Sequence, residues 1–326
     1  MLMDRREFLK LLLASGAATL VNPKLKLIAQ EQKDEEKKDE EKKFNDAEVW
    51  VAEGGDDAGK MAEAVIKEMG GMGKFIKKGE RVVIKPNIAF DREESLAATT
   101  NPAVVATVAK LAVDAGAKEV IVLDRSVANP KTTYEKSGIK KAIEAVKGVK
   151  LVYPDWKGEF GYVEKQIDGG VSLKSWSFLQ EVIDCDVLIN LPIAKTHGGA
   201  TLTLSVKNLL GIVGGNRGKL HGNLHQNIVD LTRFVKDKTR LVLIDAFRIL
   251  VEKGPQGGKP EFVRNPKVII GAKNMFTADA YATKLFTAEE KFKDLVPEKL
   301  PFLKLGFEQN LGEIRLDKIT VHKVKL

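Results

Sequence analysis

A single cysteine, Cys185, stands among the 326 residues of the sequence. One cysteine cannot form a disulfide within the chain, and it excludes zinc or iron–sulfur sites that several thiolates would hold. Cys185 lies in the run Val-Ile-Asp-Cys-Asp-Val-Leu-Ile, directly before an apolar stretch. We therefore interpret it as a buried structural thiol and expect no iron–sulfur cluster on this chain.

Long hydrophobic runs are also scarce, and the clearest one lies near the N-terminus. It extends from Leu11 to Val21 and is roughly half as long as a membrane-spanning helix requires. The preceding segment, Asp-Arg-Arg-Glu-Phe-Leu-Lys, resembles the twin-arginine export consensus. We therefore predict that residues 1–29 are a twin-arginine signal peptide. Its partner would be the twin-arginine export machinery, and the protein would be periplasmic or otherwise extracytoplasmic. Membrane contact is expected only through this segment, if it stays uncleaved.

Aromatic residues make up only 6% of the sequence, although the formal net charge is +8. No basic stripe is interleaved with aromatic side chains, so we do not expect nucleic-acid binding. Residues 1–29 hold five basic and two acidic residues, or +3, which leaves 8 − 3 = +5 for the remainder. A surplus of this size suits a small anionic ligand or an anionic surface.

Three segments of different composition divide the chain. After the signal, residues 31–43 are almost wholly Glu, Asp and Lys, so residues 30–46 are predicted to be a solvated charged spacer, with a short charged helix as the alternative. From residue 47 to 326, short apolar runs alternate with helical patterns. This alternation indicates βαβ units, and thus an α/β domain with a mainly parallel β-sheet and helices on both faces.

The expected elements follow from periodicity and capping residues. We predict strands at residues 48–52, 81–85, 119–123, 150–153, 186–191, 240–244 and 267–270, and an edge strand at 319–325. We predict helices at residues 57–69, 102–115, 133–146, 178–183, 227–235 and 276–286.

Polar residues follow four of these strands directly. Because ligands bind beyond the carboxyl ends of parallel strands, the segments after the strands are expected to share one site. The candidate binding residues are Lys85, Asn87, Arg125, Ser126, Asn190, Thr196, Gly198, Gly199, Lys207, Asn208, Asp245 and Asp279. The candidate catalytic residues are Asp124, Lys195 and His197, which can transfer protons.

The central stretch Asn-Leu-Pro-Ile-Ala-Lys-Thr-His-Gly-Gly-Ala-Thr-Leu-Thr-Leu-Ser-Val-Lys-Asn-Leu-Leu-Gly, residues 190–211, resembles the signature of the DUF362 family, a domain of unknown function. Lys-Pro-Asn at 85–87, Thr-Asn-Pro at 100–102, Gly-Ala at 116–117 and Asp124 resemble its N-terminal half, so the resemblance covers roughly residues 82–282. Two features depart from the family. The ferredoxin-like cysteine clusters of many relatives are missing, and Gly-Ala-Lys-Asn replaces the usual Gly-Thr-Asp-Pro before Asp279. The layout also looks distantly like the N-terminal domain of nickel-pincer lactate racemases.

Two glycine-rich basic segments, residues 195–199 and 214–219, suggest how an anion would bind. Lys-Thr-His-Gly-Gly at 195–199 is expected to join a strand to a helix from Thr201, whose N-terminus would favour an anion. His197 would stay neutral beside the lysines and act as a base or metal ligand. Lys207 lies in an otherwise apolar helical run, 202–212, and must snorkel to solvent, pair with another group or face a cleft.

A second histidine pair gives an alternative metal site. His221 and His225 are four residues apart, so on a helix they would share a face and could bind a divalent metal. Two functions remain open at this point. One is an enzyme acting on a small anionic substrate or cofactor. The other is a non-catalytic extracytoplasmic metal- or cofactor-binding protein, which the absence of a Gly-x-Ser-x-Gly nucleophile favours.

Overall fold

A computed structural model describes residues 42–326, of which Asp46–Leu326 form one compact unit. The predicted signal peptide, residues 1–29, and most of the predicted spacer lie outside the described residues. Within residues 42–326, no helix is both long enough and apolar enough to cross a membrane.

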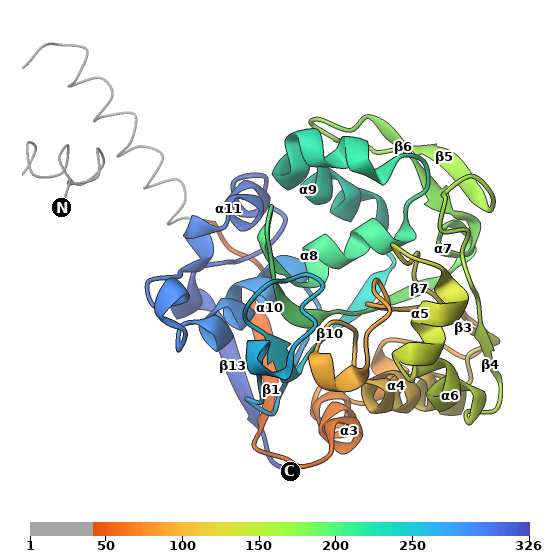
Figure 1. Cartoon of the computed structure of the whole chain (residues 1–326), viewed down its shortest axis with the longest axis horizontal. Helices are drawn as coiled ribbons and strands as arrows, with labels where there is room; N and C mark the ends of the chain where they lie inside the picture. Colours follow the sequence, from red (N-terminus) through yellow and green to blue (C-terminus); the bar gives the residue numbers. More distant parts are fainter. Residues whose placement is uncertain (1–41) are drawn as a thin grey trace, which may run out of the picture. The chain divides into compact units, whose positions relative to one another are not determined.

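A mixed, mostly parallel sheet forms the centre of this unit (Figure 1). Its strand order is β13-β1-β12-β10-β7-β2-β3-β4. Strands β10, β7, β2, β3 and β4 are parallel neighbours, whereas β12 is antiparallel to both β1 and β10. The bounds are β1 Glu48–Glu53, β2 Arg81–Pro86, β3 Glu119–Val122, β4 Val149–Leu151, β7 Val187–Leu191, β10 Thr239–Leu250, β12 Val268–Ala272 and β13 Thr320–Val324. The predicted α/β class with a mainly parallel sheet is confirmed.

Helices cover both faces of the sheet, and Figure 1 shows them as two groups on opposite sides. The first group comprises α3 Ala58–Glu68, α4 Pro102–Asp114, α5 Pro130–Lys136 and α6 Ile139–Glu144. Helix α3 packs on β1 and β12, α4 on β2 and β3, and α6 on β4, while α5 packs on α6. The second group contains α8 Ser205–Asn208, α9 Leu224–Val235, α10 Met275–Ala282 and α11 Pro301–Glu308. The cap of α4 is as predicted, because Asn101 accepts a hydrogen bond from the N–H of Ala103 and Pro102 follows it.

Two predicted helices are wrong in part. The segment 133–146 is broken into α5 and α6 at Gly138, whose φ of 77° ends the first helix. The segment 178–183 begins in β6 Ser175–Leu179, which pairs with β5 Tyr162–Gln166 in a separate two-stranded sheet, and only α7 Gln180–Asp184 is helical. The alternation of residues 162–166 escaped prediction because it is short and mostly polar.

The region from residue 192 to 212 differs most from the prediction. It was expected to be a loop followed by a helix from Thr201, but it forms the hairpin of β8 Ile193–His197 and β9 Thr201–Thr203. Helix α8 follows with only four residues, and a 3₁₀ turn continues it to Ile212. Strand β10 also runs past its predicted end at Ile244, because it pairs first with β7 and then with β8.

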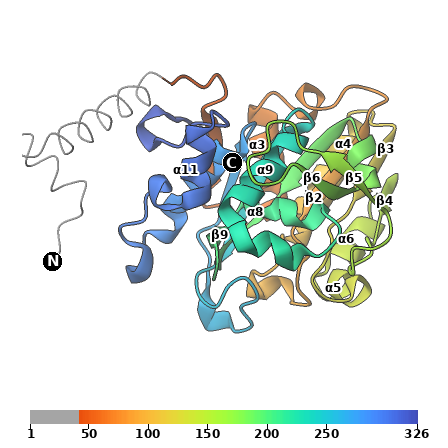
Figure 2. The same cartoon turned by 90° about the horizontal axis from the view of Figure 1, so that it is seen from above.

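Pro192 explains why β7 and β8 are separate strands. It lacks an N–H to donate, and its carbonyl accepts a hydrogen bond from the N–H of Asp245 at 2.8 Å. Strand β8 thus resumes alongside β10 after the interruption. As a result, Lys195 and His197 lie on a strand that pairs with the second half of β10. Figure 2 shows β9, the hairpin partner of this strand, from a second direction.

Candidate functional site

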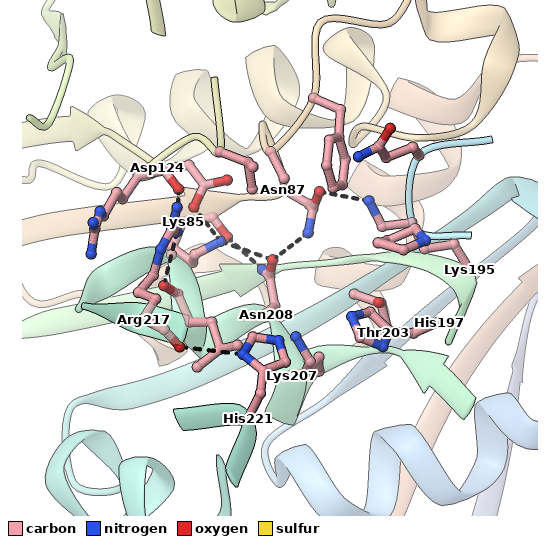
Figure 3. A pocket seen from close by; sticks show the side chains of 18 residues that line it. Lys85, Asn87, Asp124, Lys195, His197, Thr203, Lys207, Asn208, Arg217 and His221 are labelled. Atoms are coloured by element: carbon pink, nitrogen blue, oxygen red, sulfur yellow. Dashed lines mark hydrogen bonds and ion pairs between the residues drawn. The ribbon is translucent and has the colours of Figure 1, made fainter. Parts of the chain in front are cut away.

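A cavity of about 380 Å³ lies at the carboxyl ends of β2 and β3 and against β8. Nine of the predicted site residues line it: Lys85, Asn87, Asp124, Arg125, Lys195, His197, Lys207, Asn208 and His221. Figure 3 shows that most of these side chains come from separate segments of the chain and point toward the same cavity. The strand-end argument therefore located the cavity, although several other predicted residues lie outside it.

The floor of the cavity begins with a buried ion pair. Lys85, at the end of β2, places its Nζ 2.7 Å from Asp124 Oδ1, just after β3. The same Nζ donates to Pro86 O at 2.6 Å and to Asn208 Oδ1 at 2.8 Å. Gly211 packs directly on this pair, and a Cβ added there would lie 1.7 Å from Asp124 Oδ1. Only glycine fits at this position, so the backbone of Gly211 packs directly against the Lys85–Asp124 ion pair.

A chain of hydrogen bonds continues from this pair across the floor (Figure 3). Asn208 Oδ1 accepts from Lys85 Nζ and also from Asn87 Nδ2 at 3.0 Å. Asn87 Oδ1 in turn accepts from Lys195 Nζ at 3.0 Å. Each amide thus has a fixed orientation, since its oxygen already faces an ammonium or amide donor. The chain positions Lys195 relative to the Lys85–Asp124 pair.

Lys195 is buried without a carboxylate partner. Its Nζ donates to Asn87 Oδ1 and to Ala98 O, both neutral oxygens, and lies 5.1 Å from the centre of the Phe90 ring. Burial is the main cause that lowers the pKa of Lys195 to about 7; the charge of Asp124 opposes this shift, and the charges of Lys207 and Lys85 add to it. An amine that titrates near neutral pH can accept or donate a proton.

His197 stays neutral, as predicted, but its role differs from the prediction. Burial is the main cause that lowers its pKa to about 3, and the positive charge of Lys207 adds to the effect. Its Nδ1 accepts the backbone N–H groups of Gly199 and Ala200, each at 3.0 Å. The hydrogen of a neutral ring must then be on Nε2. His197 is therefore a hydrogen-bond donor, and not the proton acceptor that was expected.

Lys207 is the cation of the cavity that lacks a partner. It lies on α8 with 7% of its surface exposed, and among the described residues no hydrogen-bond or ion-pair partner contacts its Nζ. Burial lowers the pKa of Lys207 to about 8, and Arg217 and Lys85 contribute by charge repulsion. Of the three predicted alternatives, the structure shows the one in which this lysine faces a cleft. A buried ammonium without a counter-charge carries a free-energy cost that a nearby anion would offset.

The two arginines of the cavity differ in how many of their guanidinium nitrogens form hydrogen bonds within the described chain. Arg125 uses Nε, Nη1 and Nη2 to donate to the carbonyls of Trp156, Val213, Gly215 and Lys157, so it fixes the wall. Arg217 donates through Nη1 and Nη2 to carbonyls of residues 125, 126 and 210, and no bond from its Nε is formed within the described chain. Burial lowers the pKa of Arg217 to about 10, so it remains a cation.

Several predicted binding residues lie outside the cavity and stabilise its framework. Asp279 accepts from the N–H groups of Ser205 and Val206 at 2.7 and 3.0 Å, so a carboxylate of the chain itself occupies the N-terminus of α8. The predicted anion site at a helix N-terminus is therefore wrong. The others in this class are Ser126, which bonds Ile88 O, Asn190, which bonds Asn208 and Ser205 O, and Asp245, which accepts from Asn101 and Phe247.

The remaining predicted residues belong to the β8–β9 hairpin. Side chains alternate along a strand, so Thr196 faces away from Lys195 and His197. Thr196 and Gly198 line a neighbouring hollow with Glu252 and Lys253, and His197 borders both this hollow and the cavity. Gly199 lies in the hairpin turn and donates its N–H to His197.

The two histidines of the alternative metal site lie on different elements. His221 is in a 3₁₀ turn and lines the cavity, with Nδ1 3.3 Å from Arg217 O, while His225 is in α9 outside the cavity lining. Within residues 42–326, no group of three or more His, Cys, Asp or Glu side chains could hold a metal ion. A metal at this pair stays a prediction.

Sequence reasoning missed Arg217 and Thr203 as cavity residues. Thr203 is directly opposite Lys195 in the hairpin register, and its buried Oγ1 lacks a hydrogen-bond partner. Arg217 stands in a glycine-rich basic segment, which was the available signal. Phe90, Pro255 and Gln256 also line the cavity from loops, where spacing gives no indication of direction.

The fold and the cavity define an α/β protein with a cavity, lined mainly by basic side chains, at the carboxyl ends of its parallel strands. The chain belongs to the DUF362 family, described as a domain of unknown function, whose model matches residues 82–284. It is 28% identical over 258 residues to the thylakoid-associated protein sll1697 of Synechocystis, covering 77% of this chain and 75% of that protein.

Two solved structures are also similar to this chain. One is a crystal structure of a protein from Thermotoga maritima, with a TM-score of 0.47, 12% identity and 72% of this chain covered. The other is the lactate racemase apoprotein from Thermoanaerobacterium thermosaccharolyticum, with a TM-score of 0.47, 10% identity and 75% covered. The chain spans 60% and 58% of their respective lengths.

Proposed function

We propose that this protein is an enzyme that binds a small carboxylate or phosphate in the cavity and transfers a proton through Lys195. The observation that carries the proposal is Lys207, a buried ammonium that faces the cavity without a counter-charge. A site built to be stable on its own would pair or remove such a charge. A ligand that supplies the missing anion accounts for its presence.

The charge of the lining supports an anionic ligand. Five basic residues, Lys85, Lys195, Lys207, Arg125 and Arg217, face one carboxylate, Asp124. The surplus is 5 − 1 = +4 when every lysine is protonated, and about half a charge less near pH 7, where Lys195 titrates. Low-dielectric walls focus this potential into the cavity. The available donors are the Lys207 ammonium, the Thr203 hydroxyl and the Nε2–H of His197.

Lys195 favours an enzyme over the alternative of a non-catalytic binding protein. Binding an anion requires a side chain that stays positively charged. A lysine whose pKa is near 7 is charged only about half of the time at neutral pH, so it is poorly suited to this role. It is, however, well matched to general acid–base catalysis near neutral pH. Lys85 differs from Lys195 because its Nζ already contacts three oxygens, Pro86 O, Asn208 Oδ1 and Asp124 Oδ1, so it is not available for this role.

Anion binding can be tested by calorimetry with inorganic phosphate and with acetate. The wild type should bind, and Lys207→Met should weaken binding by about 10- to 100-fold, the loss of one charge-assisted hydrogen bond. Lys219→Met is the matched control, because it removes an exposed lysine from the neighbouring 3₁₀ turn outside the cavity lining. If Lys207→Met bound each anion with the same affinity as the wild type and Lys219→Met do, the anion site would lie elsewhere.

Catalysis can be separated from binding by proton NMR in deuterated buffer. A mixture of 2-oxo and 2-hydroxy carboxylates and simple phosphate esters would be incubated with the wild type and with Lys195→Met. The enzyme proposal predicts that the wild type exchanges or converts at least one compound and that the variant does not. Binding without any exchange or conversion in the wild type would favour the binding-protein alternative.

We also propose, from the N-terminal sequence alone, that the folded protein is exported by the twin-arginine route. The paired Arg5 and Arg6 before Phe-Leu-Lys support this proposal. Export would place the enzyme in an extracytoplasmic space, where its substrate must be a small soluble anion of that compartment. A divalent metal at His221 and His225 is a separate proposal, tested by elemental analysis of the natively purified protein.

A further inference from the structure

We propose that Lys195 is the nucleophile of the cavity and forms an imine with a small aldehyde or ketone that also carries a carboxylate or phosphate. This inference rests on the proposed function, because the anionic group of the substrate would bind at Lys207. It adds a substrate class, the anionic carbonyl compounds, and a covalent intermediate.

Three lysines line the same cavity and differ in the number of acceptors that each one meets. Lys85 Nζ contacts three oxygens, one of them the carboxylate of Asp124, so all three hydrogens of an ammonium are used. Lys207 Nζ has no such contact in the described chain, and its charge faces the cavity. These two lysines are suited to structure and to anion binding, respectively.

Lys195 Nζ has two acceptors, Asn87 Oδ1 and Ala98 O, and both are neutral. A neutral amine has two hydrogens and one lone pair, so two acceptors satisfy its hydrogens and leave the lone pair unused. Since the side chain lines the cavity, the lone pair has a path to a bound ligand. An ammonium at this position would hold a third hydrogen without an acceptor. The contacts therefore match the nucleophilic form of the side chain.

Donors for the carbonyl oxygen are placed next to this amine. Thr203 is the register partner of Lys195 in the hairpin, and its buried Oγ1 has no hydrogen-bond partner. His197 lies two residues along β8, on the same face of the strand, and its Nε2 carries the hydrogen. Both groups line the cavity and can donate to an oxygen on which negative charge develops.

The reaction balances without an external oxidant or reductant. The Nζ lone pair attacks the carbonyl carbon, a C–N bond forms, and one proton moves from nitrogen to the former carbonyl oxygen. The carbinolamine then loses its hydroxyl group together with the second proton of the nitrogen. The products are the C=N bond of the imine and one water molecule. Asn87 and Ala98 O hold the nitrogen in place before the attack.

The acid–base state of Lys195 agrees with this geometry. With its pKa lowered to about 7 by burial, about half of the side chain is the free amine at pH 7. An exposed lysine with a pKa near 10.4 is neutral at only a few parts in ten thousand at this pH. The reactive amine is therefore about a thousandfold more abundant at Lys195 than at a surface lysine.

The test is reductive trapping with glyoxylate and pyruvate. Each compound is incubated with the wild type at pH 7, sodium borohydride is added, and the adducts are located by peptide mass spectrometry. The expected result is one adduct per chain, on Lys195, at carbonyl concentrations at which surface lysines remain unmodified. Inorganic phosphate should reduce the yield by competition. Lys195→Met should lose this adduct, and the exposed-lysine control Lys219→Met should retain it.

Lys207→Met separates the two proposals. It should still trap acetaldehyde, which has no anionic group, as well as the wild type does, but it should trap glyoxylate at least about tenfold less, the effect of a lost charge-assisted contact. Adducts spread over surface lysines alike in the wild type and in Lys195→Met would overturn the imine. If phosphate still bound in that case, the anion site would stand; if phosphate did not bind either, the proposed function would fall with it.

Discussion

Replacing Lys207 by methionine should stabilise the unliganded protein while it weakens anion binding. Burial lowers the pKa of Lys207 from 10.5 to about 8, a difference of about 2.5. At roughly 1.4 kcal/mol for each pKa unit, holding this charge in the folded state costs about 3 kcal/mol at pH 7. Methionine has a similar length and carries no charge, so Lys207→Met should raise the free energy of unfolding by about 1 to 3 kcal/mol.

The pH dependence of this effect has a definite sign. Between pH 8 and 10.5 the unfolded chain keeps a proton on Lys207 that the folded protein has released. Wild-type stability should therefore rise with pH across this window, and the rise should be smaller in Lys207→Met by the same 1 to 3 kcal/mol, an order-of-magnitude figure. Below pH 8 both states are protonated, and the full difference between wild type and variant remains.

Urea denaturation followed by circular dichroism measures this difference, with no phosphate in the buffer. Lys85→Met is the contrasting variant, because it removes a paired lysine and leaves Asp124 buried without its counter-charge. It should lose about 3 to 5 kcal/mol. A loss of stability in Lys207→Met comparable to that of Lys85→Met would refute the reasoning, since it would mean that Lys207 contributes a structural contact.

Three further predictions concern other parts of the chain. Gly211→Ala should lower the free energy of unfolding by more than about 2 kcal/mol in denaturation experiments, because its Cβ would lie 1.7 Å from Asp124 Oδ1. An unchanged free energy of unfolding would show that the side chains of Lys85 and Asp124 can move to make room for the methyl group. Burial raises the pKa of Asp279 to about 7, so stability should fall as the pH rises from 4 to 7, and calorimetric scans should show a smaller fall in Asp279→Asn. Changing Arg5 and Arg6 to lysine should leave the protein in the cytoplasm at normal abundance, as immunoblots of cell fractions would reveal; unchanged export would contradict the signal assignment.

The sheet could be predicted because several of its strands have unbroken runs of β-branched residues in their sequence. Val82-Val83-Ile84 and Val120-Ile121-Val122 are buried on both faces, as such runs require. The polar residues after them, Lys85 and Asp124, then meet at one edge by topology alone. This is the part of the site that strand order determines.

The β8–β9 hairpin could not be predicted from periodicity. Residues 202–212 are rich in apolar side chains, and a short apolar run fits a buried helix as well as a buried strand. What decides between them is tertiary: the break at Pro192, the pairing of β8 with β10, and the carboxylate of Asp279 at the start of α8. Pro192 can be read from the sequence, but the pairing of β8 with β10 and the contact of Asp279 with α8 join segments that are far apart in the chain.

The roles of the side chains were the least predictable part. Lys85, Lys195 and Lys207 are the same residue type, so the sequence does not distinguish them. In the structure, their Nζ atoms have three, two and no acceptors, respectively. His197 was expected to accept a proton, but two backbone N–H groups from its own turn occupy Nδ1. Such differences depend on distances of a few tenths of an ångström, which spacing in the sequence does not encode.

The most direct test of the account is an NMR titration of the lysine side chains, labelled with carbon-13 at Cε, from pH 5 to 11. The wild type and Lys195→Met would be compared, with and without inorganic phosphate. The account predicts one resonance with a pKa of about 7 that is missing in Lys195→Met and whose pKa rises when phosphate binds. Titration of every wild-type lysine above pH 10, with or without phosphate, would contradict it.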